Sequence, residues 1–331
     1  MQNTPSFIFT STDKAAEILS AGGICALPTE TVYGLAASID RPEAIDAVFQ
    51  IKERPFFDPL IVHVGDVRDL SKVARSIPRA AKILAETFWP GPLTLVLPKR
   101  MEVNSRITSG LDTVAVRMPN HALCLEVIRK VGPVCAPSAN KFGKVSPTTA
   151  EHVAEEFPVL SILEGGACEI GIESTVVAVS EETFQVLRPG MITALQIEGA
   201  VRKGGIHFKE STPEALERSP GHLKHHYQPA VPLLLVSDMQ KIPIASTEIR
   251  LPDDPCLAAR ELYALMREAS QQRPAPKALI VRLKERWLED PQWRGILDRL
   301  HRAATPNYSS KVEGSSALEG LPGTGSRLGL S

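Results

Sequence analysis

The sequence predicts an α/β protein of two domains, a larger N-terminal one and a smaller C-terminal one. Apolar runs typical of strands alternate with segments that have helix caps and helical spacing, which is the pattern of a sheet covered by helices. This alternation stops over 206–230, where proline, histidine and charged residues accumulate, and resumes afterwards. A length of 331 residues also fits about two domains.

The composition is that of an ordinary globular protein. Hydrophobic residues make up 43% and charged residues 23% of the sequence, and the net charge of -1 gives a pI of about 6.7. No global positive charge attracts nucleic acid or an anionic membrane, so any RNA contact has to come from a local patch.

Cysteine usage and the N-terminus predict the compartment. The five cysteines are scattered without CxxC spacing, which favours a reducing cytoplasm. The first residues, MQNTPSFIFTSTDK, lack the features of a signal peptide, and no run approaches the roughly 18 apolar residues of a membrane span. We expect a cytoplasmic protein that neither crosses nor binds a membrane.

The N-terminal domain is expected to begin with a helix capped by Ser11 or Thr12 and stopped by a pair of glycines. The strand ICAL follows at 24–27. A second helix opens around Pro42 and has to end before Pro55, because the residue preceding a proline disfavours helical geometry.

The later strands of this domain are expected where apolar runs are bounded by turn residues. These runs lie at 59–64, 91–98, 112–119 and 132–140, with a hairpin formed by 174–179 and 183–188. Short helices separate the strands, including one after Asn120, with Asn120 as its expected N-cap, and one starting near Thr148. We expect this domain to span 1–205.

A linker is expected at 206–230, a second domain at 231–304 and a tail at 305–331. The expected elements of the second domain are strands at 231–236 and 278–283 and an amphipathic helix at 254–270. The tail is rich in glycine and serine without an apolar period, which is typical of disorder.

Common nucleotide and metal motifs are missing. There is no GxxxxGK[ST] and no HExxH, and GTGSRLG in the tail does not have the spacing of GxGxxG. His222, His225 and His226 lie in the polar linker without a fourth ligand, an arrangement more typical of solvated histidines than of a metal site. We predict no protein ligands for a metal.

Two cations, Lys52 and Arg54, lie in the segment IKERPFFDPL. Residues two apart share one side of an extended segment but not of a helix, and Pro55 favours the extended form at Arg54. Two cations held in this way suit a polyphosphate. The alternative is that they stabilise the C-terminus of the preceding helix.

Small polar side chains follow several of the expected strands. Thr113 and Arg117 would share a face of one strand, where the arginine is either surface decoration or the partner of a carboxylate. Ser138 and Asn140 come directly after another strand, and Ser174 opens the hairpin. Turn chemistry explains part of this pattern, and the rest is compatible with recognition of a polar ligand at strand ends.

Seven motifs in order across about 200 residues closely resemble the YrdC/Sua5 family. They are PTETVYGL, KxRPxxxPL, WPGPLT, VAVRMP, PSAN, ESTVV and LRPG. The linker SPGHLKHHYQP and the second domain resemble the longer Sua5 form. This resemblance implies a twisted α/β sheet with a large concave, partly positive cavity, and a Rossmann-like C-terminal domain.

The resemblance also implies an activity, L-threonylcarbamoyladenylate synthesis. L-threonine, bicarbonate or CO2, and ATP would give threonylcarbamoyl-AMP and pyrophosphate for the t6A modification of tRNA, with Mg2+ accompanying the ATP. The expected partners are these small molecules and a downstream threonylcarbamoyl transferase complex, with tRNA contacted indirectly or weakly.

Site residues carry over from the family by position. The implied threonine pocket comprises Thr31, His63, Arg117, Ser138 and Ser174. The implied ATP contacts are Lys52, Arg54, Asp58, Thr113, Asn140, Ser146, Arg188 and Tyr227. Lys52 and Arg54 are the implied catalytic cations, and Tyr227 would close over the nucleotide as part of a lid.

Two positions depart from the family pattern. The linker has His222 after its glycine where relatives often carry methionine, and Asp58 stands where an uncharged amide also occurs. As an anion, Asp58 could approach a phosphate only through a cation or a bridging water.

Two other functions remain open at this point. An RNA-binding or ribosome-associated module would use a concave basic face, although the near-neutral charge counts against it. Carbamoyl-adenylate chemistry, as in hydrogenase-maturation carbamoyltransferases, would require acylphosphatase and zinc-finger-like segments, and the chain has no CxxC pair. Pyrophosphate release that depends on ATP and threonine would separate the synthase from both.

Overall fold

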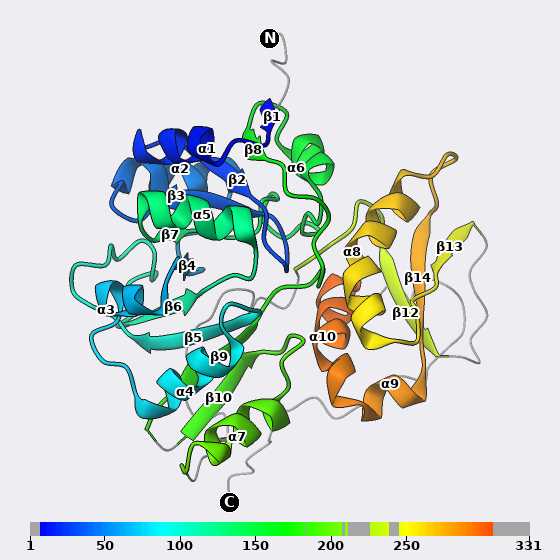
Figure 1. The fold of residues 1–331 in the computed structure, drawn as a ribbon. Coiled ribbons are helices and arrows are strands. Elements are labelled where there is room, and N and C mark those ends of the chain that lie inside the picture. Colours follow the sequence, from blue (N-terminus) through cyan, green and yellow to red (C-terminus); the bar gives the residue numbers. More distant parts are fainter. Residues whose placement is uncertain (1–6, 182, 207–208, 211–225, 238–244, 307–331) are drawn as a thin grey trace, which may run out of the picture.

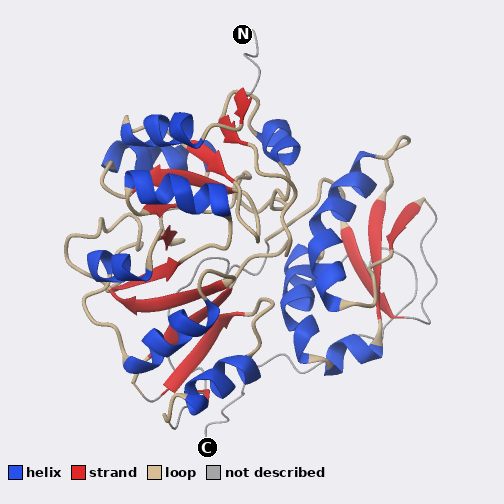
Figure 2. Ribbon diagram, viewed as in Figure 1, coloured by secondary structure: helices blue, strands red, loops and turns tan. Residues whose placement is uncertain are grey.

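The computed structural model describes residues 7–306 except 182, 207–208, 211–225 and 238–244. It contains a large mixed sheet with helices around it and, beside it, a smaller sheet covered by helices (Figures 1 and 2). The predicted α/β class with a second, smaller α/β domain is confirmed. Among the described residues, no helix is long and apolar enough to cross a membrane.

The large sheet has the strand order β1-β8-β2-β3-β7-β4-β6-β5-β9-β10-β11. Its strands are β1 (Phe7–Phe9), β2 (Cys25–Leu27), β3 (Gly34–Ser38), β4 (Ile61–His63), β5 (Leu93–Pro98), β6 (Thr113–Arg117), β7 (Val134–Cys135), β8 (Ser161–Leu163), β9 (Thr175–Val179), β10 (Thr183–Arg188) and β11 (Lys209–Glu210). The expected hairpin is β9 and β10, which pair antiparallel.

Two of the helices of this domain begin at or next to an expected cap. The helices are α1 (Thr12–Ser20), α2 (Pro42–Lys52), η1 (Val67–Asp69), α3 (Leu70–Val73), α4 (Arg79–Phe88), α5 (Ala122–Val131), α6 (Ala150–Glu156) and α7 (Ala194–Lys203). Ser11 caps α1 by accepting from the backbone N–H of Lys14, and Thr149 caps α6. The cap expected at Asn120 is wrong: His121 holds that position, without a side-chain cap bond.

The second domain has a parallel three-stranded sheet. Its elements are β12 (Leu233–Ser237), β13 (Ser246–Ile249), α8 (Pro255–Gln271), β14 (Ala278–Leu283), α9 (Glu285–Glu289), η2 (Pro291–Trp293) and α10 (Arg294–Ala303). The strand order is β12-β14-β13, with both outer strands parallel to β14. In Figure 1, α8 and α10 lie on the side of this sheet that faces the large domain.

The core of the second domain is not built from that domain alone. Val32, Val145 and Ile172 of the large domain belong to the same buried cluster as Leu262 and Trp293 of the small one. The two domains therefore share apolar packing as well as a chain connection.

The predicted boundaries at 205, 230 and 304 stay a prediction. Most of the expected linker and nearly all of the expected tail lie outside the described residues, together with His222 and His225. His226 is described and is buried, which corrects the expectation that the linker histidines are solvated.

Candidate active site

A pocket opens in the large domain at the ends of several strands, and its lining combines apolar residues with polar and charged ones, three of them arginines. Eight of the predicted site residues line this pocket: Thr31, Arg54, His63, Arg117, Ser138, Ser174, Arg188 and Tyr227. Segments far apart in the sequence thus converge on one cavity, as expected for a site at the strand ends of an α/β sheet.

Two threonines shape one wall of the pocket. The Thr29 hydroxyl donates to the Val32 carbonyl at 2.6 Å and accepts from the backbone N–H groups of Thr31 and Val32, each at 3.2 Å. This turn fixes Thr31 so that its hydroxyl accepts a hydrogen bond from Arg117 Nη1 at 2.8 Å. The Thr29 hydroxyl of the motif PTETVYGL therefore stabilises the turn of its own loop.

Arg117 is anchored at the end of β6. Its Nη2 pairs with the Glu30 carboxylate and its Nε donates to the Gly91 carbonyl at 3.2 Å. Together with the bond to Thr31, these contacts use three of the five N–H donors of a guanidinium. The remaining donors suit a second carboxylate, while Glu30 offsets the charge of the buried arginine.

His63 lies directly beside Arg117, because β4 and β6 are parallel neighbours that pair these two residues. Burial and the adjacent guanidinium lower the pKa of His63 to about 3. His63 is therefore neutral in the physiological range and presents a hydrogen-bonding group to the pocket without adding charge.

Arg54 enters the pocket from the segment after α2. Glu53 ends that helix in a left-handed conformation, at φ 53°, which turns the chain out of the helix. Arg54 then donates from Nε to the Asp58 carbonyl at 3.1 Å and from Nη2 to the Pro59 carbonyl at 2.8 Å. An ion pair of 2.9 Å joins Arg54 Nη2 to the Asp58 carboxylate, so Asp58 holds the arginine in place.

Lys52 lies beneath the pocket wall. It is the last residue of α2 and is almost fully buried, and its Nζ donates to the carbonyls of Ser138 and Asn140, both at 2.5 Å. Burial, followed by the charge of Arg54, holds the pKa of Lys52 well below its usual range. In this structure Lys52 braces the loop that carries Ser138, and its contact with ATP phosphates stays a prediction.

Three further predicted ATP contacts, Asn140, Ser146 and Thr113, do not line the pocket. The Asn140 amide donates to the carbonyls of Lys141 and Lys144, and Ser146 donates to the Glu173 carboxylate at 2.6 Å. Thr113 does not line the described pocket, because it begins β6 while Arg117 ends it, about 13 Å further along the strand.

Ser174 and Arg188 form a hydrogen-bonded pair in the lining of the pocket. Arg188 Nη2 donates to the Ser174 hydroxyl at 3.1 Å and to its carbonyl at 3.0 Å, and the same hydroxyl lies 2.7 Å from that of Thr94. Burial lowers the pKa of Arg188, although the nearby Glu173 counteracts that shift. The guanidinium groups of Arg54, Arg117 and Arg188 thus line one cavity.

Tyr227 covers part of the pocket from the linker. It is 1% exposed and adopts a φ of 63°, a conformation that non-glycine residues adopt rarely and at a cost. The ring of His226 packs edge-on against it at 4.1 Å, and the Arg299 guanidinium lies 5.3 Å from the Tyr227 ring centroid. The predicted position of Tyr227 over the site fits this arrangement.

Three polar lining residues are absent from the predicted site residues: Thr29, Glu173 and His226. Glu173 has the most partners of the three, since Tyr263 and Arg299 of the C-terminal domain both donate to its carboxylate. Burial alone would raise its pKa, but Arg299, Arg188 and the hydrogen bond from Ser146 lower it to about 2. Its place directly before Ser174 in ESTVV was the available signal.

We predict that unfolding free energy falls as the pH drops below about 6.5. Burial and neighbouring cations lower the pKa of both His63 and His226 to about 3, from an unfolded value of 6.5. Below pH 6.5 the unfolded chain therefore binds protons that the folded protein does not, which costs up to about 1.4 kcal/mol per histidine per pH unit.

Urea unfolding between about pH 7.5 and pH 5.5 measures this effect. His63→Asn should flatten the dependence, whereas His301→Asn, at an exposed position on α10, should leave it as in the unchanged protein. An equal slope of unfolding free energy against pH in all three proteins would contradict the assignment of this effect to His63.

Two protein-family models match most of the chain. A family model named Sua5/YciO/YrdC, described as telomere recombination, matches residues 17–190. A second model, described as the C-terminal domain of threonylcarbamoyl-AMP synthase, matches residues 192–305.

Two curated proteins match about two thirds of this chain. Threonylcarbamoyl-AMP synthase of Bacillus subtilis is 44% identical over 228 residues, which cover 67% of this chain and 65% of that protein. The enzyme of the same name from Pyrococcus abyssi is also 44% identical over 228 residues, covering 67% of this chain and 66% of its own length. Each match thus spans just under two thirds of the relative.

A solved structure extends the comparison over nearly the whole fold. The crystal structure of P. abyssi Sua5 complexed with L-threonine is 33% identical and has a TM-score of 0.78. The superposition covers 91% of this chain and 98% of that one.

Proposed function

Because the chain belongs to the Sua5/YciO/YrdC family and matches the Sua5 C-terminal domain, we propose that it is an L-threonylcarbamoyladenylate synthase. It would convert L-threonine, bicarbonate or CO2, and ATP into threonylcarbamoyl-AMP and pyrophosphate, for the t6A modification of tRNA. The observation that carries this proposal is the convergence of Arg117, Arg54 and Arg188 on one pocket with hydroxyl-bearing walls.

The threonine end of the pocket would lie between Thr31 and Ser174. The free donors of Arg117 suit the carboxylate of the amino acid, and neutral His63 and Ser138 offer hydrogen bonds to its other polar groups. The complex of P. abyssi Sua5 with L-threonine supports a threonine subsite in this fold.

The phosphate end would lie near Arg54 and Arg188. Negative charge builds on phosphate oxygens as pyrophosphate leaves, and preorganised cations in a site that excludes water stabilise that charge strongly. Mg2+ would enter on the phosphates of ATP, since no group of three or more His, Cys, Asp or Glu in the described part of the chain could hold a metal ion. Asp58, moreover, is already paired with Arg54.

No covalent enzyme intermediate is required. The neutral amine of threonine attacks CO2 and loses a proton to solvent, which forms a carbamate. A carbamate oxygen then attacks the α-phosphorus of ATP as the bond to pyrophosphate breaks. The residues of the pocket would act by positioning and by charge stabilisation. The carbamate and the mixed anhydride are both labile in water, so a closed pocket would raise the yield.

Tyr227→Ala is expected to lower the yield of adenylate per pyrophosphate released and to raise the KM for ATP by about 10-fold, because water then reaches the pocket. Tyr227→Phe keeps the ring and serves as the control, with near-normal yield expected. Chromatographic measurement of adenylate and pyrophosphate checks this, and an unchanged yield and KM in Tyr227→Ala would overturn the lid role.

The test of the proposed function is an incubation of the full chain with ATP, Mg2+, bicarbonate and either L-threonine, L-serine or no amino acid. We expect pyrophosphate and an adenylate that form only with threonine. RNA binding in a parallel assay, without any threonine-dependent product, would replace the proposal with a binding module. An adenylate formed in a parallel incubation with carbamoyl phosphate and ATP, and not with threonine, would point to carbamoyl-adenylate chemistry.

The cellular setting is also part of the proposal. All five cysteines are free in the structure, which suits a reducing cytoplasm. The labile product would pass to a downstream threonylcarbamoyl transferase, with tRNA contacted indirectly or weakly.

A further inference from the structure

Glu173 is the point where the two domains meet at the pocket. Its carboxylate accepts from Ser146 of the large domain at 2.6 Å, and from Tyr263 at 2.9 Å and Arg299 Nε at 2.8 Å, both in the small domain. All of these groups are buried. A buried carboxylate with this many donors is held in one orientation.

Arg299 on α10 spans two loops of the large domain. Besides the Glu173 carboxylate, it donates from Nη2 to the Glu173 carbonyl at 3.1 Å and from Nη1 to the Pro189 carbonyl at 2.6 Å. The side chain is 0% exposed, so these bonds form without competition from water. Only the planar fork of an arginine can reach all three acceptors in this way.

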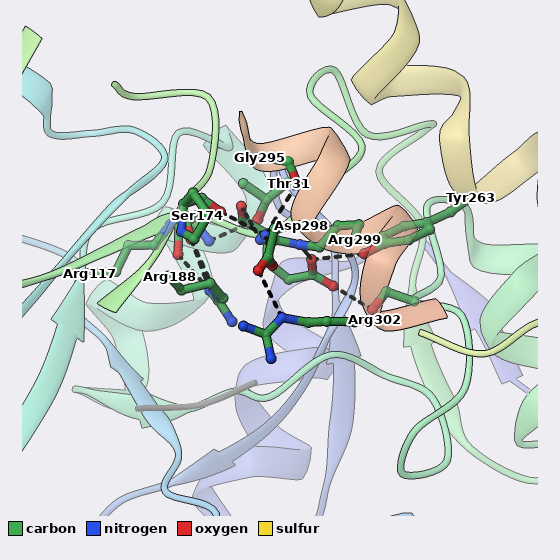
Figure 3. Close-up of polar contacts among 12 residues, drawn as sticks. Thr31, Arg117, Ser174, Arg188, Tyr263, Gly295, Asp298, Arg299 and Arg302 are labelled. Carbon is green, nitrogen blue, oxygen red and sulfur yellow. Dashed lines mark hydrogen bonds and ion pairs between the residues drawn. The ribbon is translucent and has the colours of Figure 1, made fainter. Parts of the chain in front are cut away.

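Each loop held by Arg299 carries a pocket residue next to the point of contact. Ser174 follows Glu173, and Arg188 precedes Pro189. Figure 3 shows Arg299 between Tyr263 on one side and Ser174 with Arg188 on the other. The mutual bonds of Ser174 and Arg188 join the two loops a second time, at the pocket surface.

The backbones at this junction are also in close contact. A Cβ atom on Gly295 of α10 would lie 2.9 Å from the backbone of Gly190, closer than real Cβ contacts allow. The helix that carries Arg299 therefore packs directly on the loop after Arg188, and its position determines the position of that loop.

We propose that Arg299 of the C-terminal domain is a positioning residue for the reaction: by holding the Glu173 and Pro189 loops, it sets the placement of Ser174 and Arg188. The C-terminal domain thereby completes the pocket of the other domain. This inference rests on the proposed function, because its readout is the synthesis of the adenylate.

The test compares Arg299→Lys with Arg294→Lys, a matched control at an exposed position of the same helix. Arg299→Lys keeps the charge but loses the fork. At a temperature where circular dichroism shows the variant to be folded, we expect kcat to fall at least about 10-fold and the KM values for threonine and ATP to rise, with Arg294→Lys unchanged. A merely structural role would leave kcat of the folded variant normal.

A double-mutant cycle shows whether Arg299 and the Glu173 carboxylate affect the reaction together or independently. If Arg299 acts through Glu173, Arg299→Lys should lower kcat/KM by less than about 3-fold in a Glu173→Gln background. Gly295→Ala should displace the loop at Pro189 and Gly190 by steric contact and should also lower kcat. This variant tests whether the position of that loop controls the reaction even if Arg299→Lys does not fold.

The outcomes are distinct. Absence of threonine-dependent product from the unchanged protein would overturn the proposed function and this inference with it. Normal kcat in both folded Arg299→Lys and Gly295→Ala would overturn the inference alone, whereas losses that multiply fully in the cycle would assign the effect of Arg299 to the Pro189 loop.

Discussion

Replacement of Arg54 by alanine is expected to lower threonine- and ATP-dependent pyrophosphate release by about 10^2- to 10^3-fold, the usual effect of losing one preorganised group that stabilises developing charge. The change also leaves the Asp58 carboxylate buried without its ion-pair partner, close to the proposed phosphate site. The unpaired charge is expected to cost about 3–5 kcal/mol of unfolding free energy.

Activity and stability can be separated at this position. Arg54→Ala combined with Asp58→Asn removes both charges, so the stability should largely return while the activity stays low. Arg68→Ala, at an ion pair whose arginine side chain is 89% exposed, is the control and should change neither quantity. Recovery of activity in the double variant would show that Arg54 acts only by neutralising Asp58.

Replacement of Arg117 by alanine is expected to weaken L-threonine binding by about 100-fold, equivalent to about 2.7 kcal/mol. The variant loses the group that suits the amino acid's carboxylate, and it exposes that carboxylate to the negative charge of Glu30. Calorimetric titration with L-threonine measures the effect.

The matched experiment is titration with ATP. ATP affinity should change by less than about 3-fold in Arg117→Ala, because Arg54 and Arg188 remain in place. Adding Glu30→Gln should restore part of the lost stability, since the buried carboxylate is then neutral. If folded Arg117→Ala bound L-threonine with unchanged affinity, the carboxylate of the amino acid would have to bind elsewhere in the pocket.

Local signals in the sequence predicted much of the fold. Hydroxyl caps and proline positions identify α1 and α2 because the relevant contacts lie within three or four residues. The expected cap at Asn120 failed by one residue, where the chain enters α5 through His121 without a side-chain cap bond. Strand β13 and helix α10 were missed, since β13 is short and α10 is polar on average apart from its buried face.

The candidate site was predicted less completely than the fold. Most of the proposed residues line one pocket, because family motifs record which side chains converge. The motifs do not reveal that Lys52 bonds to backbone carbonyls, nor that Glu173 is paired with Arg299, 126 residues away. Such long-range contacts depend on how distant segments of the chain pack together, which no local pattern encodes.

The shared apolar cluster between the domains has a consequence for cooperativity. Residues such as Val32 and Ile172 of the large domain pack into the core of the small one, so that core cannot form fully without them. Unfolding of either domain would expose apolar surface on the other and destabilise it. We expect one calorimetric transition for the whole chain, and the two halves should melt together even if the connection between them is cut.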